Sequence, residues 1–475
     1  MYTQEFIAIG CYFLLLLAIG YFSYQKHMSA TGFIIGNRSM NSWLTALAAH
    51  ASDMSSWLVM AYPAAVFSRG VISAWTAIGL TTCMYLNWRI IAPKIRVATE
   101  KFNSMTFSSF FESRFKDTSG KIRVFSAIVL IVFYTIYISA GLTTLGHNLE
   151  LLFGLKYGIG VLIGLIIVIP YVFMGGYLTI AWIDLFQGLF LMCVILFIPL
   201  YLLPQVGGWA AISENISLNN LSSQLIPDFS QGTIISIISL AFGWGLGYFG
   251  QPHIVTKFMG IKKVSDIPTS KWIGMTWMVL SLGAATLIGL VGIAFFKGEL
   301  NNPELVLVEM VKRSFSPLIL GFVLCAIIAT TINAMSSQIL VLSSSLAEDL
   351  YKKLWHKKAS SKDVLLASRL GILLVACFAF LIALRNTNTI YELVLYAWSG
   401  IGAAFGPLVI LSLYSKKANK YGAWAGILVG GSVSAIWPLF NHFLPLGPLI
   451  PGFFASMVSI LYVSHLTRHK LSHKV

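Results

Sequence analysis

One apolar stretch of the chain is interrupted by a carboxylate. Asp53 lies in the run Ala48–Ser56, which has uninterrupted hydrophobic sequence on both sides. An acidic side chain at mid-membrane depth costs roughly 2.5–3.5 kcal/mol on insertion scales. We therefore expect Asp53 to face a polar cavity, a partner or a cation rather than lipid. Two other interpretations stay open, because Asp53 could be protonated or could cap a half-helix.

The composition indicates an all-α integral membrane protein. Hydrophobic residues make up 57% and charged residues 10% of the 475 residues, and apolar runs of about 20 residues, each long enough to span a bilayer, recur along the chain. Hydropathy and the spacing of Lys, Arg, Gly and Pro predict thirteen transmembrane helices. Their ranges are 5–24, 43–68, 71–94, 122–147, 157–174, 183–206, 233–257, 272–297, 317–345, 364–384, 391–414, 421–441 and 447–468.

The basic residues predict an orientation. The connections on one side of these spans carry 24 Lys and Arg residues, seven of them in 94–123, and those on the other side carry six. The richer side is expected in the cytoplasm, which puts the N-terminus outside and the C-terminus inside. The formal charge of +15 is then a signal of topology, and no nucleic-acid partner is expected.

The first span is not expected to be a cleaved signal peptide, because no Lys or Arg precedes it and its apolar core is too long. The five cysteines all lie within predicted spans and show no CxxC spacing, so disulfides and zinc sites are not expected. They are Cys11, Cys83, Cys193, Cys325 and Cys377.

The spans suggest an internal duplication. Residues 43–206 and 233–414 each contain five spans, and each set opens with a span interrupted by Gly, Ser or Pro. An odd number of helices per set makes the second set enter the membrane in the opposite direction, as in inverted-topology repeats that bind substrate between broken helices. Residues 1–42 then form an extra helix and a loop, and 415–475 two further helices and a short tail.

The second interrupted span is rich in glycine. Residues 242–253 contain four glycines and Pro252, which weaken the helix and free backbone groups to bind a solute. Trp244 and Tyr248 are four positions apart and would share a helix face. Glycine-mediated helix packing is the alternative explanation.

Several segments carry a resemblance to a known family. The sequences SDMSSWLVMAYPAAVF at 52–67 and WGLGYFGQPHI at 244–254 resemble signature segments of the sodium:solute symporter family, and within it those of bacterial sodium/proline symporters. Further similar segments occur in the same order over most of the chain: GNRSM at 36–40, TIYISAG at 135–141, GGYLTIAWIDLFQ at 175–187, SSSLAEDLYKK at 343–353 and YAWSGIGAAFGPLVI at 396–410. The resemblance implies a LeuT-type five-plus-five fold with one extra N-terminal and two extra C-terminal helices.

The resemblance also implies site residues. Those for the substrate are Ser55, Trp57, Tyr137, Trp244, Tyr248 and Pro252. Free backbone amides would hold a proline carboxylate, and aromatic faces would enclose the pyrrolidine ring. Arg38 and Asp184 match charged residues that the family links to ion coupling and gating.

The implied sodium site departs from the family pattern. Its ligands would be the carbonyls of Ala51 and Met54 and, on the ninth span, the Thr330 carbonyl with side chains at Asn333 and Ala334. An alanine side chain offers no ligand, whereas the amide oxygen of Asn333 suits a hard cation. His50 replaces a familiar glycine and can titrate near neutral pH, so proton coupling through His50 stays open beside sodium coupling. His50 and Asp53 therefore join Arg38 and Asp184 as expected coupling or gating residues.

The sequence thus predicts a secondary transporter that imports L-proline with sodium across the bacterial cytoplasmic membrane. Proton-coupled symport of proline or a related solute is an alternative. A channel and a transporter-like sensor are further alternatives. Sensor relatives would carry a large C-terminal domain, whereas this sequence ends at Val475, soon after the last span. An enzyme is not expected, because no metal-spaced cluster of His, Asp and Glu and no GxSxG motif occurs. No cofactor is expected either, and sodium, or a proton in its place, is implied only as the co-transported ion.

Overall fold

The described part of the chain is helical. The computed structural model describes residues 3–23, 29–385, 388–440, 443 and 445–468. Within these ranges it contains nineteen α-helices and no strand beyond two isolated bridges. The first ten helices are α1 (Thr3–Ser23), α2 (Ala30–Ile35), α3 (Ser42–Ala51), α4 (Tyr62–Arg69), α5 (Ala74–Leu86), α6 (Ala92–Lys101), α7 (Phe107–Arg114), α8 (Lys121–Phe153), α9 (Tyr157–Gln205) and α10 (Gly208–Leu218).

The remaining helices cover the second half of the chain. They are α11 (Gln231–Gly245), α12 (Pro252–Met259), α13 (Ile267–Phe296), α14 (Val306–Ser314), α15 (Pro317–Ser344), α16 (Ser361–Ala383), α17 (Ile390–Tyr414), α18 (Lys420–Ile436) and α19 (Leu449–Leu466). The π-helical segments η2 (Trp57–Ala61) and η8 (Ser345–Trp355) and the 3₁₀ segments η5 (Leu246–Phe249) and η7 (Pro303–Leu305) extend or join them.

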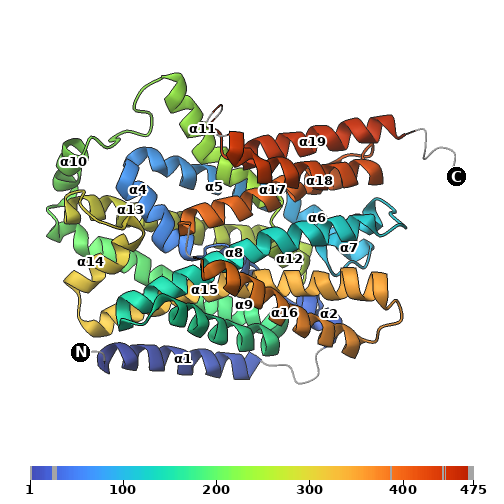
Figure 1. Cartoon of the computed structure of the whole chain (residues 1–475), viewed down its shortest axis with the longest axis horizontal. Coiled ribbons are helices and arrows are strands. Elements are labelled where there is room, and N and C mark those ends of the chain that lie inside the picture. The colour runs from blue at the N-terminus through green and yellow to red at the C-terminus, as the bar shows by residue number, and fades with distance from the viewer. Residues whose placement is uncertain (1–2, 24–28, 386–387, 441–442, 444, 469–475) are drawn as a thin grey trace.

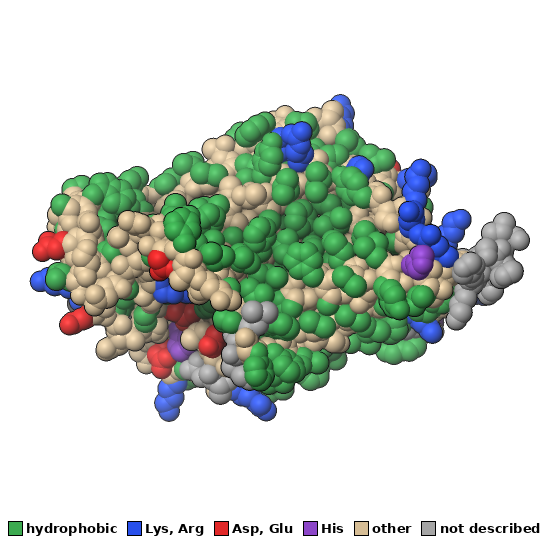
Figure 2. Space-filling model, turned by 90° about the horizontal axis from the view of Figure 1, so that it is seen from above, with side chains coloured by type: hydrophobic (Ala, Val, Ile, Leu, Met, Phe, Trp, Pro, Cys, Tyr) green, Lys and Arg blue, Asp and Glu red, His purple; other side chains and the backbone are tan. Residues whose placement is uncertain are grey.

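Nine described helical segments are long and apolar enough to cross a membrane. The prediction of an all-helical membrane protein is therefore confirmed. Figure 2 shows a broad hydrophobic band between two ends where charged side chains gather, and basic side chains predominate at the end near the C-terminus. This shape matches a protein whose middle lies in lipid.

The described parts of all thirteen expected ranges are largely helical, and most of the observed helix ends differ from the expected boundaries by a few residues. Helix α9 covers both 157–174 and 183–206, and only Gly176 has a non-helical conformation, with φ 61°. The later span thus begins at Gly176 rather than 183, because the apolar residues after the kink, such as Ile180 and Ala181, are already buried in the core.

The core lies around α15. Its span is 83% buried, compared with 28% for α16 and 33% for α18. Helices α18 and α19 pack together on one side of the molecule, and α1 lies on the opposite side against α9 and α15 (Figure 1). The first and the last two helices therefore flank a central bundle.

Candidate functional site

The first interrupted helix breaks after Ala51. Ser52 ends α3 by donating its hydroxyl hydrogen to the Ala48 carbonyl at 2.6 Å. The hydrogen bonds that close the break end on the carbonyls of residues 48, 49, 50, 53 and 55, so the carbonyls of Ala51 and Met54 are outside this set. Helical structure resumes with η2, as the sequence predicted, although α3 runs four residues further than the expected start of the break.

Asp53 lies within this break and is 1% exposed. Its backbone carbonyl accepts a hydrogen bond from the Trp57 indole at 3.2 Å, and its Oδ2 accepts one from the Tyr248 hydroxyl. Its other carboxylate oxygen, Oδ1, has no hydrogen-bond partner among the residues that the structure describes. Asp53 faces the protein interior, as expected, and retains capacity for a further ligand.

The second interrupted helix changes to a 3₁₀ turn at Leu246 and breaks at Gly250 and Gln251 before α12 begins at Pro252. A Cβ atom on Gly250 would overlap the backbone of Gly402 and Gly406 on α17. Glycine-mediated helix packing is thus present at this break. The carbonyl of Tyr248 accepts a hydrogen bond from Asn87 at 2.9 Å, which fixes the turn that carries the tyrosine.

Aromatic rings bring the two breaks together. The rings of Trp57 and Trp244 are 5.6 Å apart, and the Tyr248 ring is 5.3 Å from that of Trp398 on α17. Trp244 donates its indole hydrogen to the Tyr391 hydroxyl at 3.2 Å. Sequence reasoning missed Tyr391 and Trp398, because nothing in their local sequence indicates that α17 covers these rings.

Tyr391 also lines a hollow at one end of the molecule. This hollow has a volume of about 610 Å³ and is lined by Arg69 and Glu304 as well. Burial raises the pKa of Glu304 from its ordinary value, and the carboxylate accepts a hydrogen bond from the Tyr391 backbone amide at 3.2 Å. Tyr391 thus stands between this hollow and Trp244.

Two predicted hydroxyl groups lie near Asp53. Ser55 and Tyr137 are buried, their hydroxyls lie beside each other, and neither oxygen has a hydrogen-bond partner of ordinary geometry in the described ranges. Buried polar groups are rarely left without partners. The hydroxyls of Ser55 and Tyr137 are therefore suited to bind a solute. Pro252 is buried at the first turn of α12.

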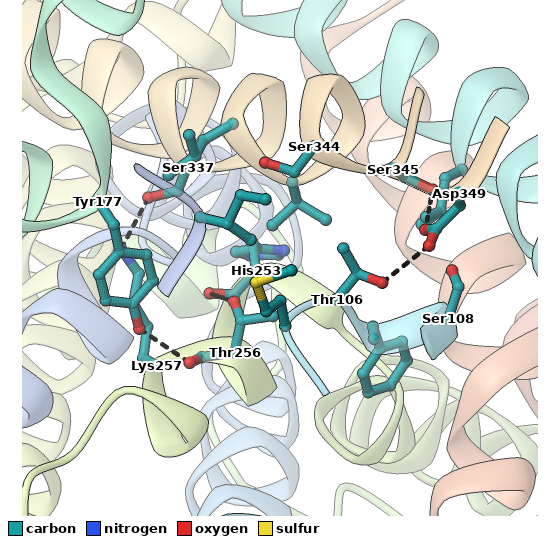
Figure 3. Close-up of a pocket in the computed structure, with 16 residues that line it drawn as sticks. Thr106, Ser108, Tyr177, His253, Thr256, Lys257, Ser337, Ser344, Ser345 and Asp349 are labelled. Carbon is teal, nitrogen blue, oxygen red and sulfur yellow. Dashed lines mark hydrogen bonds between the residues drawn. The ribbon is translucent and has the colours of Figure 1, made fainter. Parts of the chain in front are cut away.

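Asp184 belongs to a buried ion pair. The ammonium of Lys257 lies 3.3 Å from Asp184 Oδ2. It also lies 3.2 Å from the Ser337 hydroxyl (Figure 3), so α12 joins α9 to α15. Lys257 is one of the 24 basic residues assigned from the sequence to connections on the richer side. That assignment was wrong, because Lys257 is buried within α12. The signal was available, since Lys257 stands in an apolar run.

The side chain of His50 packs against two tryptophans, whereas the carboxylate of Asp53 contacts Tyr248. Its Nε2 accepts a hydrogen bond from the Trp88 indole at 3.1 Å, and Trp277 packs against its other side. An indole nitrogen can only donate, so His50 Nε2 carries no proton in this arrangement. The proton of a neutral ring then lies on Nδ1, which has no hydrogen-bond partner among the residues that the structure describes.

The predicted ion residues of the ninth span lie on α15, which packs against α3. Thr330, Asn333 and Ala334 are all buried. The hydroxyl of Thr330 donates to the Ile327 carbonyl at 2.9 Å, whereas the amide oxygen Oδ1 of Asn333 has no partner in the part of the chain described. An unpartnered buried oxygen fits a cation ligand.

Arg38 lies beside the C-terminal end of α12, at Met259. Its guanidinium donates to the carbonyls of Met259, Thr99 and Ser104, each at 3.0 Å. Partial burial lowers the pKa of Arg38, but an arginine stays protonated in proteins. Arg38 therefore fastens the end of α12 to α6 and to the loop after it.

Comparison with known proteins gives consistent matches. The profile of a family described as the sodium:solute symporter family matches residues 33–430. The high-affinity proline transporter PutP of Bacillus subtilis is 41% identical over 95% of this chain and 96% of its own length. The sodium/proline symporter 2 of Staphylococcus saprophyticus is 40% identical over 98% and 93%, respectively. A sodium-coupled sialic acid symporter, solved in a substrate-bound outward-open state, has a TM-score of 0.80 at 18% identity, and the match covers 98% of both chains.

Proposed function

The chain belongs to the sodium:solute symporter family, and from that premise we propose that it imports L-proline together with sodium across the bacterial cytoplasmic membrane. It is a transporter rather than an enzyme, as predicted. Support for proline comes from the full-length similarity to two proteins named as proline transporters. Support for sodium comes from the names of the staphylococcal relative and the solved symporter.

The hydrogen bond between Tyr248 and Asp53 is the observation that carries this proposal. It joins the break of one helix to the break of another, which is where substrate and ions bind in transporters built from inverted repeats. A change at either break is thereby transmitted to the other.

We place proline between the two breaks. The Trp57 and Trp244 rings provide apolar faces for the pyrrolidine ring, and the unpartnered hydroxyls of Ser55 and Tyr137 provide polar contacts. Tyr248 and Pro252 complete the predicted set of substrate residues, and the side of the Tyr248 ring is proposed to contact proline. No side chain caps the start of η2, so backbone amides there are proposed to bind the carboxylate.

The sodium ion is placed beside the first break. Its proposed ligands are the carbonyls of Ala51 and Met54, the Thr330 carbonyl and the Asn333 amide oxygen, with Ala334 contributing no side-chain oxygen. The unpartnered Oδ1 atoms of Asn333 and Asp53 support this assignment, because hard cations prefer oxygen ligands and a nearby negative charge.

Proton coupling through His50 is less well supported. The hydrogen bond from Trp88 occupies the Nε2 atom, and Trp277 covers the ring. A histidine that exchanges protons during transport needs access to water. Sodium is therefore the coupling ion in our proposal.

The transport cycle follows from the proposed five-plus-five arrangement. Residues 43–206 and 233–414 form the two repeats, and alternating access moves one against the other around the shared site. The basic residues place the C-terminus in the cytoplasm and the N-terminus outside. Arg38 and Asp184, which tie α12 to neighbouring helices, are placed in coupling and gating.

Binding measurements on the purified protein test the proposal. We expect labelled proline to bind more tightly when sodium replaces potassium at constant ionic strength and pH. The Ser55→Ala variant should reduce proline binding, whereas Ser23→Ala, at the end of α1 and distant from both breaks, should not. Proline binding that is insensitive to sodium would contradict coupling at this site.

A further inference from the structure

A narrow cavity leads away from the second break. It has a volume of about 20 Å³ and is lined at one end by His253, Lys257 and Ser337. At its other end lie Thr106 and Asp349 (Figure 3). The cavity thus extends from the buried Lys257–Asp184 pair toward the end of the molecule that carries the 94–123 connection.

A much wider hollow lies beyond the narrow cavity. Its volume is about 520 Å³, and Met105 and Thr106 line both spaces. Arg123, Lys352 and Lys353 are among the residues that line it. This hollow lies at the end of the molecule that the basic residues predict to be cytoplasmic. The residues around Thr106, here called the wall, separate the narrow cavity from the hollow.

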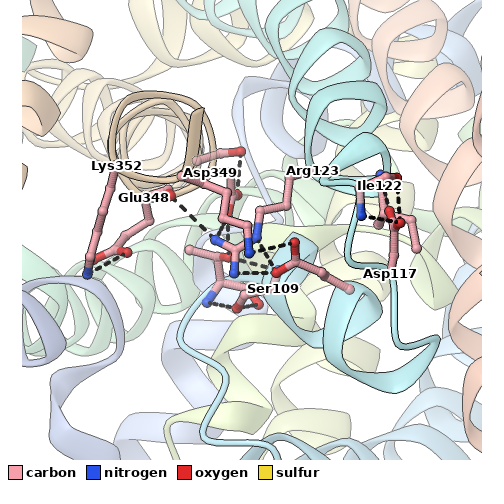
Figure 4. Close-up of polar contacts among 12 residues, drawn as sticks. Ser109, Asp117, Ile122, Arg123, Glu348, Asp349 and Lys352 are labelled. Carbon is pink, nitrogen blue, oxygen red and sulfur yellow. Dashed lines mark hydrogen bonds and ion pairs between the residues drawn. The ribbon is translucent and has the colours of Figure 1, made fainter. Parts of the chain in front are cut away.

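The wall is closed by a buried carboxylate. Asp349, which is 0% exposed, accepts hydrogen bonds from the Thr106 hydroxyl at 2.9 Å and from the Ser345 hydroxyl at 2.8 Å. Its Oδ1 also lies 3.1 Å from the Arg123 guanidinium (Figure 4). Charge-assisted contacts of this kind are stronger than neutral hydrogen bonds when water is excluded.

Arg123 extends the connection to a third segment. Its Nη2 atom lies 2.7 Å from Glu112 Oε2 on α7, and the other oxygen of Glu112 lies 3.1 Å from Lys353 on η8. Helices α7 and α8 belong to the first proposed repeat and η8 to the second. The network therefore fastens the two repeats together at the cytoplasmic end.

We propose that Thr106, Asp349 and Arg123 form the cytoplasmic gate, which must open to release substrate and sodium. This inference rests on the proposed transport function. Opening separates α7 and α8 from η8, and the water that enters hydrates the carboxylate and the guanidinium, which offsets the bonds that break. Removing one of these bonds favours the open state.

Cysteine accessibility tests the gate. The reporter is Ser344→Cys, which lines the narrow cavity, in a full-length chain whose five native cysteines are replaced by serine. Labelling by a membrane-impermeant maleimide is measured from the cytoplasmic side of membrane vesicles. Adding Asp349→Asn or Thr106→Val should raise the labelling rate about tenfold, the effect of losing one charge-assisted hydrogen bond that holds the closed state.

Glu348→Gln is the matched control. Its side chain pairs with Lys352 in the same segment at 3.1 Å, and only its backbone carbonyl faces Arg123. This variant should leave the labelling rate unchanged. Thr106→Val changes little volume and therefore keeps the test usable if Asp349→Asn fails to fold.

Labelling requires neither proline nor sodium, so its result is independent of which solute is carried. Unchanged labelling in either folded gate variant would overturn the gate, as would an equal increase in Glu348→Gln. Failure of the wild-type protein to take up proline would instead count against the proposed function.

Discussion

The Tyr248 hydroxyl donates a hydrogen bond to Oδ2 of Asp53, although the two residues are 195 positions apart in the chain. Tyr248 follows three closely spaced glycines and precedes the break between η5 and α12, whereas Asp53 lies two residues after the end of α3. One carboxylate oxygen is thus held by a residue proposed to contact proline, and the other, which has no partner among the described residues, is proposed to face the cation. Binding of one ligand then alters the environment of the other, which is the physical requirement for coupling.

Asp53→Asn should preserve membrane insertion and lower sodium-driven proline uptake by roughly tenfold or more at limiting sodium, within the range typical of coupling free energies. The amide removes the negative charge that favours the cation-bound state. Initial uptake rates against sodium concentration measure this effect. Tyr248→Phe is the companion variant, because it removes the hydrogen bond and keeps the charge; it should raise the half-saturating sodium concentration less. Wild-type uptake by Asp53→Asn at limiting sodium would exclude the proposed role.

Replacing Trp244 or Tyr248 with alanine should weaken proline binding by about 1–3 kcal/mol, because a ring contact and a hydrogen bond are lost. Equilibrium binding of labelled proline is the measurement. Trp43→Ala is the control, since that ring is 56% exposed and takes part in neither break. A similar loss in all three variants would indicate general destabilisation instead.

The sequence predicted the two breaks well because the signals are local. A charged residue within an apolar helix and closely spaced glycines each weaken a helix wherever they occur, and the chain is interrupted at both places. The hydrogen bond between Tyr248 and Asp53 was not predicted, since no local pattern indicates which helices meet. The contact of Trp244 with Tyr391 was missed for the same reason.

Lys257 shows a second limit of sequence reasoning. A lysine near the end of an apolar run resembles a residue of a cytoplasmic connection, and only the fold reveals that Asp184 lies opposite it. His50 is the reverse case, because its titratable ring suggested proton coupling, whereas the packing of Trp88 and Trp277 around it is typical of a structural histidine.

Lys257→Met should destabilise the protein by about 3–5 kcal/mol, because it leaves the buried Asp184 carboxylate without its counter-charge. The double variant Asp184→Asn with Lys257→Met should recover much of this loss, since no unpaired charge remains. Thermal unfolding in detergent would show the difference. If the double variant is no more stable than Lys257→Met alone, the pair does not act as a unit.

Asn333→Ala should raise the sodium concentration needed for half-maximal uptake, because it removes an oxygen proposed to bind the ion. Ala334→Thr should lower it by adding a hydroxyl at the neighbouring position. Both effects are read from uptake rates against sodium at fixed pH. Unchanged sodium dependence in both variants would show that α15 supplies other ligands.

Uptake of labelled proline by the purified protein in proteoliposomes tests the central claim most directly. An inward sodium gradient without a pH gradient is compared with an inward proton gradient without sodium. We predict that proline accumulates above its external concentration under the sodium gradient alone, and that His50→Gly does not make this uptake dependent on pH. Accumulation that follows the proton gradient and ignores sodium would contradict the account.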